Sequence, residues 1–118
     1  MEAASAGAGE AGGTVIGILP GNSAAEGNPY LTFAVATGLS EARNAIIART
    51  ANAVIAVGGE FGTLSEIGLA LKMGKPVIGL QTWSICPPGS LKGGITEASS
   101  PEEAVDRAFE LAGETIRG

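Results

Sequence analysis

Short, unbroken runs of apolar residues alternate along the chain with segments whose apolar positions recur at helical spacing. The runs cover residues 14–19, 53–57 and 77–80 and include several β-branched side chains. Runs of this length without polar alternation are typical of strands buried on both faces of a parallel sheet. We therefore predict three such strands, to which residues 32–36 can add a short fourth one.

The segments before and after the first strand predict helices. Residues 1–13 consist almost entirely of Ala, Gly and Glu, which suits either a helix packed closely on a sheet or a frayed tail. Ser40 is placed to cap a second helix that runs to about Ala51. Arg43 then falls in the first turn of that helix, where the helix dipole disfavours a cation.

Two further helices have recognisable ends. One starts near Thr63, and its last turn is followed by Gly74 and Pro76, as at many helix C-termini. The other starts at Ser100-Pro101-Glu102-Glu103 and runs to about Ile116. That start combines an N-cap, a proline at the first helical position and a capping-box glutamate.

The alternation of strands and helices predicts the fold class. We expect a single α/β domain over residues 1–118, built as a three-layer, Rossmann-like parallel sheet with helices on both faces. In such sheets, ligands bind beyond the carboxyl ends of the strands. Residues 20–39 and 81–99 lie at that edge and exceed the usual loop length, which favours a functional role for them.

Charge and hydropathy limit the possible partners. The formal net charge is −5 at pH 7, which argues against nucleic acid or an anionic membrane bound through a broad basic surface. No apolar run reaches the roughly 18 residues of a membrane span, and the first residues lack the pattern of a signal peptide. We therefore expect a soluble, cytoplasmic protein whose partner is a small molecule.

Cysteine and histidine usage limits the possible chemistry. The chain has one cysteine, Cys86, and no histidine. It cannot form an internal disulfide, and zinc sites and Ser-His or Cys-His catalysis lack their residues. We expect no metal and no resident cofactor, so any acid-base chemistry falls to carboxylates.

Residues 54–66 carry the strongest functional signal, because a buried strand, a glycine-rich turn and a helix start follow one another directly. Gly58, Gly59 and Gly62 let the backbone approach a ligand closely, while free N–H groups and the helix dipole favour an anion. The Thr63 hydroxyl can add a donor. The other interpretation is that these glycines only make a tight turn.

The type of anion follows from what the turn lacks. No Lys-Ser or Lys-Thr follows Gly62, so the turn is not a Walker A loop, and it does not match the dinucleotide fingerprint of three spaced glycines. A monophosphate is therefore a better match than a triphosphate or NAD.

Three other residues have both a functional and a structural interpretation. Glu66 can complete a capping box with Thr63 or act as a general acid near the phosphate. Arg43 can be an exposed residue or the partner of an anion that offsets its place in the helix dipole, and Asn44 beside it can add a polar contact. Trp83 can stack on a base or pack under its own loop.

These features together resemble those of the LOG-like proteins, once described as possible lysine decarboxylases. The resemblance rests on Arg43, on Gly58-Gly59-x-x-Gly62-Thr63-x-x-Glu66 and on Gly74-Lys75-Pro76-Val77, and it runs from about residue 2 to the final helix. It is strongest for the bacterial and archaeal branch related to DNA-processing protein A and to molybdenum-cofactor carrier proteins.

The resemblance implies a function. Characterised LOG proteins are phosphoribohydrolases that release a base from a nucleoside 5′-monophosphate. It implies Arg43 and Glu66 as the catalytic pair, with Gly58, Gly59, Gly62 and Thr63 around the phosphate. A carboxylate can stabilise the positive charge that develops on the ribose when the N-glycosidic bond breaks. The resemblance also implies a homodimer or higher homo-oligomer.

This chain departs from the family pattern in three places. Val57 replaces the proline that precedes the two glycines, and Glu41-Ala42 replaces a Met-His pair before the arginine. The family also begins with a strand, a glycine-rich loop, a helix and a second strand, whereas this chain begins at the next helix, so we expect a fold truncated at the N-terminus and an internal methionine at Met1. These departures leave the substrate open.

Three functions are therefore considered. The first is nucleotide binding with phosphoribohydrolase ancestry. The second is a binding protein without catalysis, such as a molybdenum-cofactor carrier whose cargo has a terminal phosphate. The third, a DNA-processing protein, is disfavoured by the acidic charge.

Overall fold

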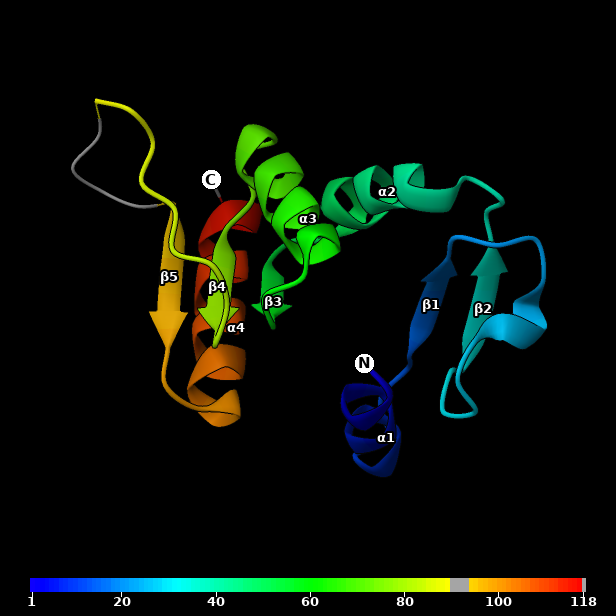
Figure 1. The fold of residues 1–118 in the computed structure, drawn as a ribbon. Coiled ribbons are helices and arrows are strands. Elements are labelled where there is room, and N and C mark those ends of the chain that lie inside the picture. Colours follow the sequence, from blue (N-terminus) through cyan, green and yellow to red (C-terminus); the bar gives the residue numbers. More distant parts are fainter. Residues whose placement is uncertain (90–93, 118) are drawn as a thin grey trace. The chain divides into compact units, whose positions relative to one another are not determined.

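The computed structural model describes residues 1–89 and 94–117, with side chains described up to Gly113. The chain divides into two compact units, Met1–Arg43 and Asn44–Gly118, whose elements are labelled in Figure 1. Every strand pair in the described residues is parallel. The predicted α/β class, with parallel sheets flanked by helices, is confirmed, and a single domain over residues 1–118 stays a prediction.

The first unit contains a helix and a two-stranded sheet. Its elements are α1 (Glu2–Glu10), β1 (Ile16–Leu19), the 3-10 turn η1 (Ala24–Glu26), β2 (Phe33–Ala36) and the 3-10 turn η2 (Ser40–Ala42). The two strands run parallel, with Ile16 opposite Phe33 and Leu19 opposite Ala36. The predicted helix in residues 1–13 and the short strand in residues 32–36 are therefore confirmed.

The prediction that the first strand is buried on both faces is wrong. Ile16 of β1 is 57% exposed, and Phe33 beside it in β2 is 62% exposed. A sheet of two strands has too few neighbours within this unit to cover both of its faces. The β-branched run still forms a strand, because its backbone pairs with β2.

The prediction that Ser40 caps the second helix is also wrong. The helix α2 spans Arg43–Thr50 and begins three residues after Ser40, which instead opens the turn η2 with a φ of 51°. The Ser40 N–H donates to the Pro20 carbonyl at 3.0 Å. This tie holds the segment after β2 against the segment after β1 and delays the start of the α-helix.

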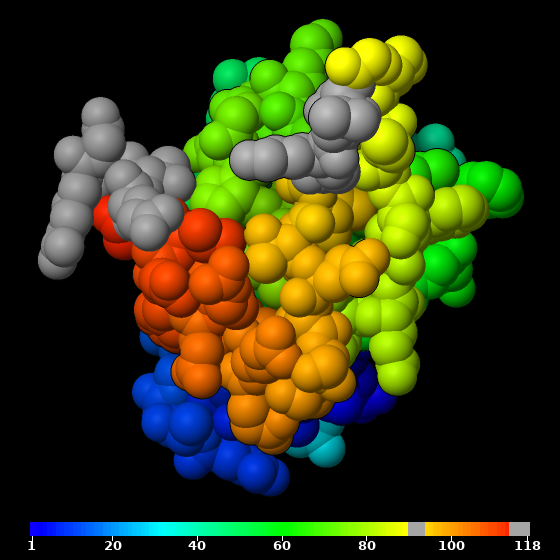
Figure 2. All heavy atoms as spheres, turned by 90° about the vertical axis from the view of Figure 1, so that its left-hand side faces the viewer, coloured from blue at the N-terminus to red at the C-terminus, as the bar shows by residue number. Residues whose placement is uncertain are grey.

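The second unit contains a three-stranded sheet with helices on it (Figure 1). Its elements are β3 (Val54–Val57), α3 (Phe61–Lys72), β4 (Val77–Leu80), β5 (Ile95–Ala98) and α4 (Pro101–Arg117), with strand order β3-β4-β5. The strand β5 was not predicted and lies within the long segment 81–99. In Figure 2 its gold atoms lie beside the orange start of α4.

Alternation along the strands divides the core of this unit between the two faces of the sheet. Val54, Ala56 and Val77 pack with Ile67 and Ala70 of α3. Ile78, which follows Val77 in β4, points to the opposite face because successive strand residues alternate. That face is covered by α4, whose Ala104 is 1% exposed.

Candidate phosphate-binding turn

The glycine-rich turn connects β3 to α3, and the helix begins two residues before the predicted start at Thr63. Its first residue is Phe61, and Glu60 is the N-cap without a side-chain cap bond. Thr63 is therefore the third helical residue and not the N-cap that a capping box with Glu66 requires, so of the two interpretations of Glu66 the capping box is wrong. The extended backbone of Glu60 lets the helix start directly after the turn.

This start leaves backbone donors at the turn. The amide of Leu64 donates to the Glu60 carbonyl at 3.1 Å. The amides of residues 61–63 precede that bond and have no partner within the helix. Three N–H groups at the positive end of the helix dipole form an arrangement that favours an anion.

The space around the glycines is open. An added Cβ at Gly58, Gly59 or Gly62 would meet no atom within 4 Å. Gly58 has a φ of 87°, a conformation that L side chains rarely adopt, so the turn itself needs that glycine. No contact within the described residues explains Gly59 and Gly62 by crowding, and their open surroundings leave room for a ligand.

The segment after β4 lies directly against this turn. The Thr82 hydroxyl donates to the Gly58 carbonyl at 2.5 Å, and the Trp83 indole N–H donates to the Glu60 carbonyl at 3.2 Å. The rings of Trp83 and Phe61 lie 5.7 Å apart. Trp83 also packs against the core on the α3 side, which supports its interpretation as a packing residue, while base stacking stays a prediction.

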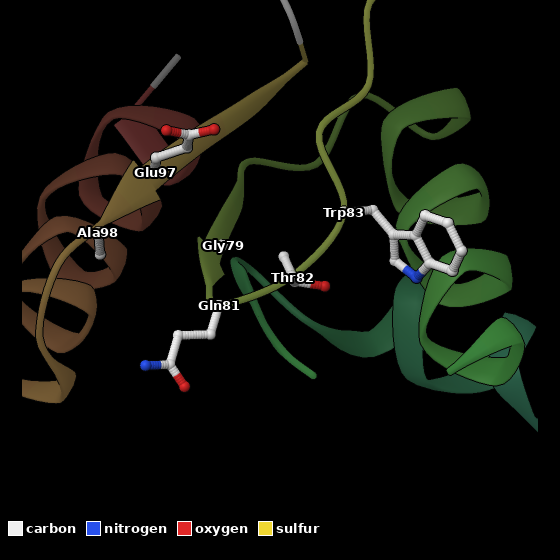
Figure 3. Close-up of a pocket in the computed structure, with 6 residues that line it drawn as sticks. All are labelled: Gly79, Gln81, Thr82, Trp83, Glu97 and Ala98. Carbon is white, nitrogen blue, oxygen red and sulfur yellow. The ribbon is translucent and has the colours of Figure 1, made fainter. Parts of the chain in front are cut away.

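A hollow of about 220 Å³, here called the edge pocket, lies at the carboxyl ends of β4 and β5 (Figure 3). The residues that line it are Gly79, Gln81, Thr82, Trp83, Glu97 and Ala98. In Figure 2 the yellow-green residues after β4 lie beside the gold strand β5. No local pattern in the sequence predicts this pocket, because Glu97 belongs to an unpredicted strand and Thr82 reaches the turn only through the fold.

Arg43 and Asn44 both lie at the start of α2, so Arg43 has its predicted place in the first turn. Its Nη1 donates to the Ile18 carbonyl at 2.9 Å, while its buried Nε has no hydrogen-bond partner among the described residues. Asn44 is 3% exposed, and its Oδ1 likewise has no partner within the described part of the chain. Contacts of these side chains with a ligand stay predictions.

Glu66 lies on α3, three residues beyond Thr63, and is half-buried. Arg43 belongs to the first unit and Glu66 to the second, and their role as a catalytic pair stays a prediction.

In the described residues, no group of three or more His, Cys, Asp or Glu side chains is placed to hold a metal ion. No helix there is both long and apolar enough to cross a membrane.

Comparison with known proteins identifies the family. Residues 1–108 match the model of the SLOG cluster4 family, so the chain belongs to that family. It is 42% identical over 106 residues to an uncharacterized protein of Archaeoglobus fulgidus, covering 90% of this chain and 66% of that one.

Solved structures are also similar. The molybdenum cofactor binding protein of Rippkaea orientalis is 38% identical with a TM-score of 0.81, over 94% of this chain and 70% of that one. The molybdenum cofactor carrier protein of Chlamydomonas reinhardtii is 37% identical with a TM-score of 0.77, over 93% and 69%. The chain thus spans about two thirds of the length of these relatives. The predicted relation to cofactor carriers is confirmed, and the relation to LOG hydrolases stays a prediction.

Proposed function

We propose that this member of the SLOG cluster4 family is a binding protein that holds the terminal phosphate of a small molecule on the Gly58–Thr63 turn. The cargo that we propose is the molybdenum cofactor, carried without chemical change. The likeness to two proteins described as binding or carrying that cofactor, at 37–38% identity over 93–94% of this chain, is the observation that carries the proposal.

The geometry of the turn supports this proposal. Three helix amides without helical partners and the open space at Gly59 and Gly62 suit a phosphate that approaches the backbone closely. The protein as a whole is acidic, with a net charge of −5. An anionic cargo therefore depends on this local arrangement rather than on the overall field.

A loading experiment tests the proposal. The protein is incubated without oxygen with cofactor released from a molybdoenzyme and is then separated from small molecules by gel filtration. We expect molybdenum, measured by mass spectrometry, and the oxidised pterin, measured by fluorescence, to elute with the protein in equal amounts. Elution of both with the small molecules would overturn the proposal.

A phosphoribohydrolase is the second candidate. It is favoured by the position of Glu66, a half-buried carboxylate on the helix that begins at the turn. The test is incubation with AMP and chromatography for free adenine. Adenine release by the wild type that is lost in Glu66→Gln would establish this activity. AMP recovered intact would leave the carrier function as the remaining proposal.

A further inference from the structure

The edge pocket borders the glycine-rich turn and belongs to the same unit, but its chemistry is different. The turn offers N–H donors, whereas Glu97 is the charged residue among those that line the pocket. The Glu97 Oε1 accepts a hydrogen bond from the Ser84 hydroxyl at 3.1 Å. A carboxylate at this place repels a phosphate and accepts hydrogen bonds from N–H groups of an uncharged ring.

The strand register places Glu97 on the pocket. Ile95 packs against the core on the α3 side, and Glu97, two residues further along β5, points to the same face. Glu97 lies opposite Gly79 of β4. A Cβ at Gly79 would come within 2.8 Å of Ile95 and of Thr82, so this position in the pocket lining has no room for a side chain.

The size of the pocket limits what it can hold. Its volume of about 220 Å³ is below the roughly 300 Å³ at which sites for whole ligands begin. One small ring system fits this volume better than a complete nucleotide or cofactor. The rest of such a ligand would then lie outside the pocket.

Two hydrogen bonds connect the pocket to the turn. Thr82 and Trp83, which line the pocket, donate to the carbonyls of Gly58 and Glu60. The turn follows β3 and the pocket lies at the ends of β4 and β5, so the lateral offset between the two is one to two strand spacings, roughly 5–10 Å. A sugar-sized linker between a ring and a phosphate can span this distance.

We propose that the edge pocket recognises the amino-pyrimidinone edge shared by pterins and guanine. The Glu97 carboxylate accepts hydrogen bonds from two adjacent N–H groups of that edge, while the phosphate of the same molecule lies on the turn. The position of the phosphate rests on the proposed function, whereas recognition of the ring rests on Glu97.

The test compares ligands that share a phosphate and differ at this edge. Binding of GMP, of IMP, which lacks the amino group, and of ribose 5-phosphate is measured by calorimetry for the wild type and Glu97→Gln. We expect the wild type to bind GMP about tenfold or more tightly than IMP, because hydrogen bonds to a charged group are involved. Glu97→Gln should abolish this preference and leave ribose 5-phosphate binding unchanged.

A matched control and a second pair of ligands keep the result unambiguous. Glu102→Gln removes one exposed carboxylate elsewhere in the unit and should keep the preference for GMP. Pterin and lumazine, which differ at the same edge and lack a phosphate, test Glu97 independently of the turn, and comparing neopterin with guanosine distinguishes a pterin from a purine ligand. Equal binding of GMP and IMP, or a preference that survives Glu97→Gln, would overturn the inference.

Loss of the phosphate site gives a different result. If ribose 5-phosphate does not bind while pterin still binds more tightly than lumazine, the proposed function fails and recognition of the ring stands. If neither preference for the amino group is found, recognition of the ring fails whatever the phosphate does.

Discussion

At the scale of single residues, Thr63 is the side chain through which the proposed phosphate site is most directly tested. It is the third residue of α3, at the helix end that presents free N–H groups. Thr63→Val keeps the shape and removes the hydroxyl donor. We expect the affinity for ribose 5-phosphate to fall about tenfold or more, as for loss of a hydrogen bond to a charged group.

Calorimetric titration measures this effect, with Ser65→Ala as its control. Ser65 is an exposed residue two positions further along the same helix. Its loss should leave the affinity unchanged. Equal affinity of Thr63→Val and the wild type for ribose 5-phosphate would show that the Thr63 hydroxyl does not bind the phosphate.

Residue identities predicted the turn better than the groups around it. Glycines followed by a threonine between a strand and a helix predict a tight turn at a helix N-terminus from neighbouring residues alone, and the fold has such a turn there. Thr82, Trp83 and Glu97 come to the turn and its pocket from a distant segment. No local pattern marks such contacts, because they depend on how β4 pairs with β3 and with β5.

At the scale of elements, Lys75 joins two of them. Its Nζ donates to the carbonyls of Arg49 at 3.1 Å and Ala51 at 2.7 Å, where α2 ends. A cation at a helix C-terminus also interacts favourably with the dipole. We expect Lys75→Met to lower the free energy of unfolding by about 1–2 kcal/mol, measured by urea denaturation. Lys72→Met removes an exposed cation from the last turn of α3 and should lower it by less, about 0.3–0.5 kcal/mol, because only a dipole interaction is lost. Equal effects of both variants would contradict this role of Lys75.

The start of α4 is sensitive to pH. The Glu103 carboxylate accepts hydrogen bonds from the hydroxyl of Ser99 at 2.6 Å and from its N–H at 3.3 Å. These bonds lower the pKa of Glu103 below its ordinary value of 4.5. A carboxyl group whose pKa is lower in the folded state than in the unfolded state stabilises the fold while it is ionised. This stabilisation is complete above the unfolded-state pKa and is lost as the pH falls through the folded-state pKa.

We therefore expect Glu103→Gln to unfold at a lower urea concentration than the wild type at neutral pH. The difference should shrink as the pH falls below 4.5. Ser99→Ala removes the partner and should lose most of the same pH dependence. A difference between wild type and Glu103→Gln that stays constant with pH would contradict this account.

Helix ends were predictable only where the signal was local. Ser100 accepts from the Glu103 N–H at 3.1 Å and Pro101 is the first residue of α4, as predicted. Glu103 reaches back to Ser99 rather than to Ser100. The strand β5 was missed because Ile95–Ala98 contains Thr96 and Glu97 and so lacks the unbroken apolar run of the predicted strands.

At the scale of the whole molecule, self-association is expected. Ile16 and Phe33, which pair across β1 and β2, expose more than half of their surface. Exposed apolar side chains of this kind favour contact with another surface. We predict a homodimer or higher oligomer by light scattering coupled to gel filtration, and Phe33→Ser should shift the distribution toward monomer. A wild-type monomer at all concentrations would contradict this prediction.

The central claim is that the cargo binds through the glycine-rich turn, and two glycines of α3 allow a matched test. Gly62 lies in the first turn and Gly68 in the middle of the helix, both are exposed, and a Cβ at either would meet no atom within 4 Å. Either position can therefore take a Cβ without a clash, and the two variants introduce the same side chain. An added carboxylate at Gly62 also suits the helix dipole, so the variant should fold.

The decisive measurement is the amount of molybdenum cofactor retained by Gly62→Asp and Gly68→Asp after loading and gel filtration. We predict that Gly62→Asp loses the cofactor, because its carboxylate occupies the place of the phosphate and repels it, while Gly68→Asp retains as much as the wild type. Full retention by Gly62→Asp, or equal loss in both variants, would contradict binding at this turn.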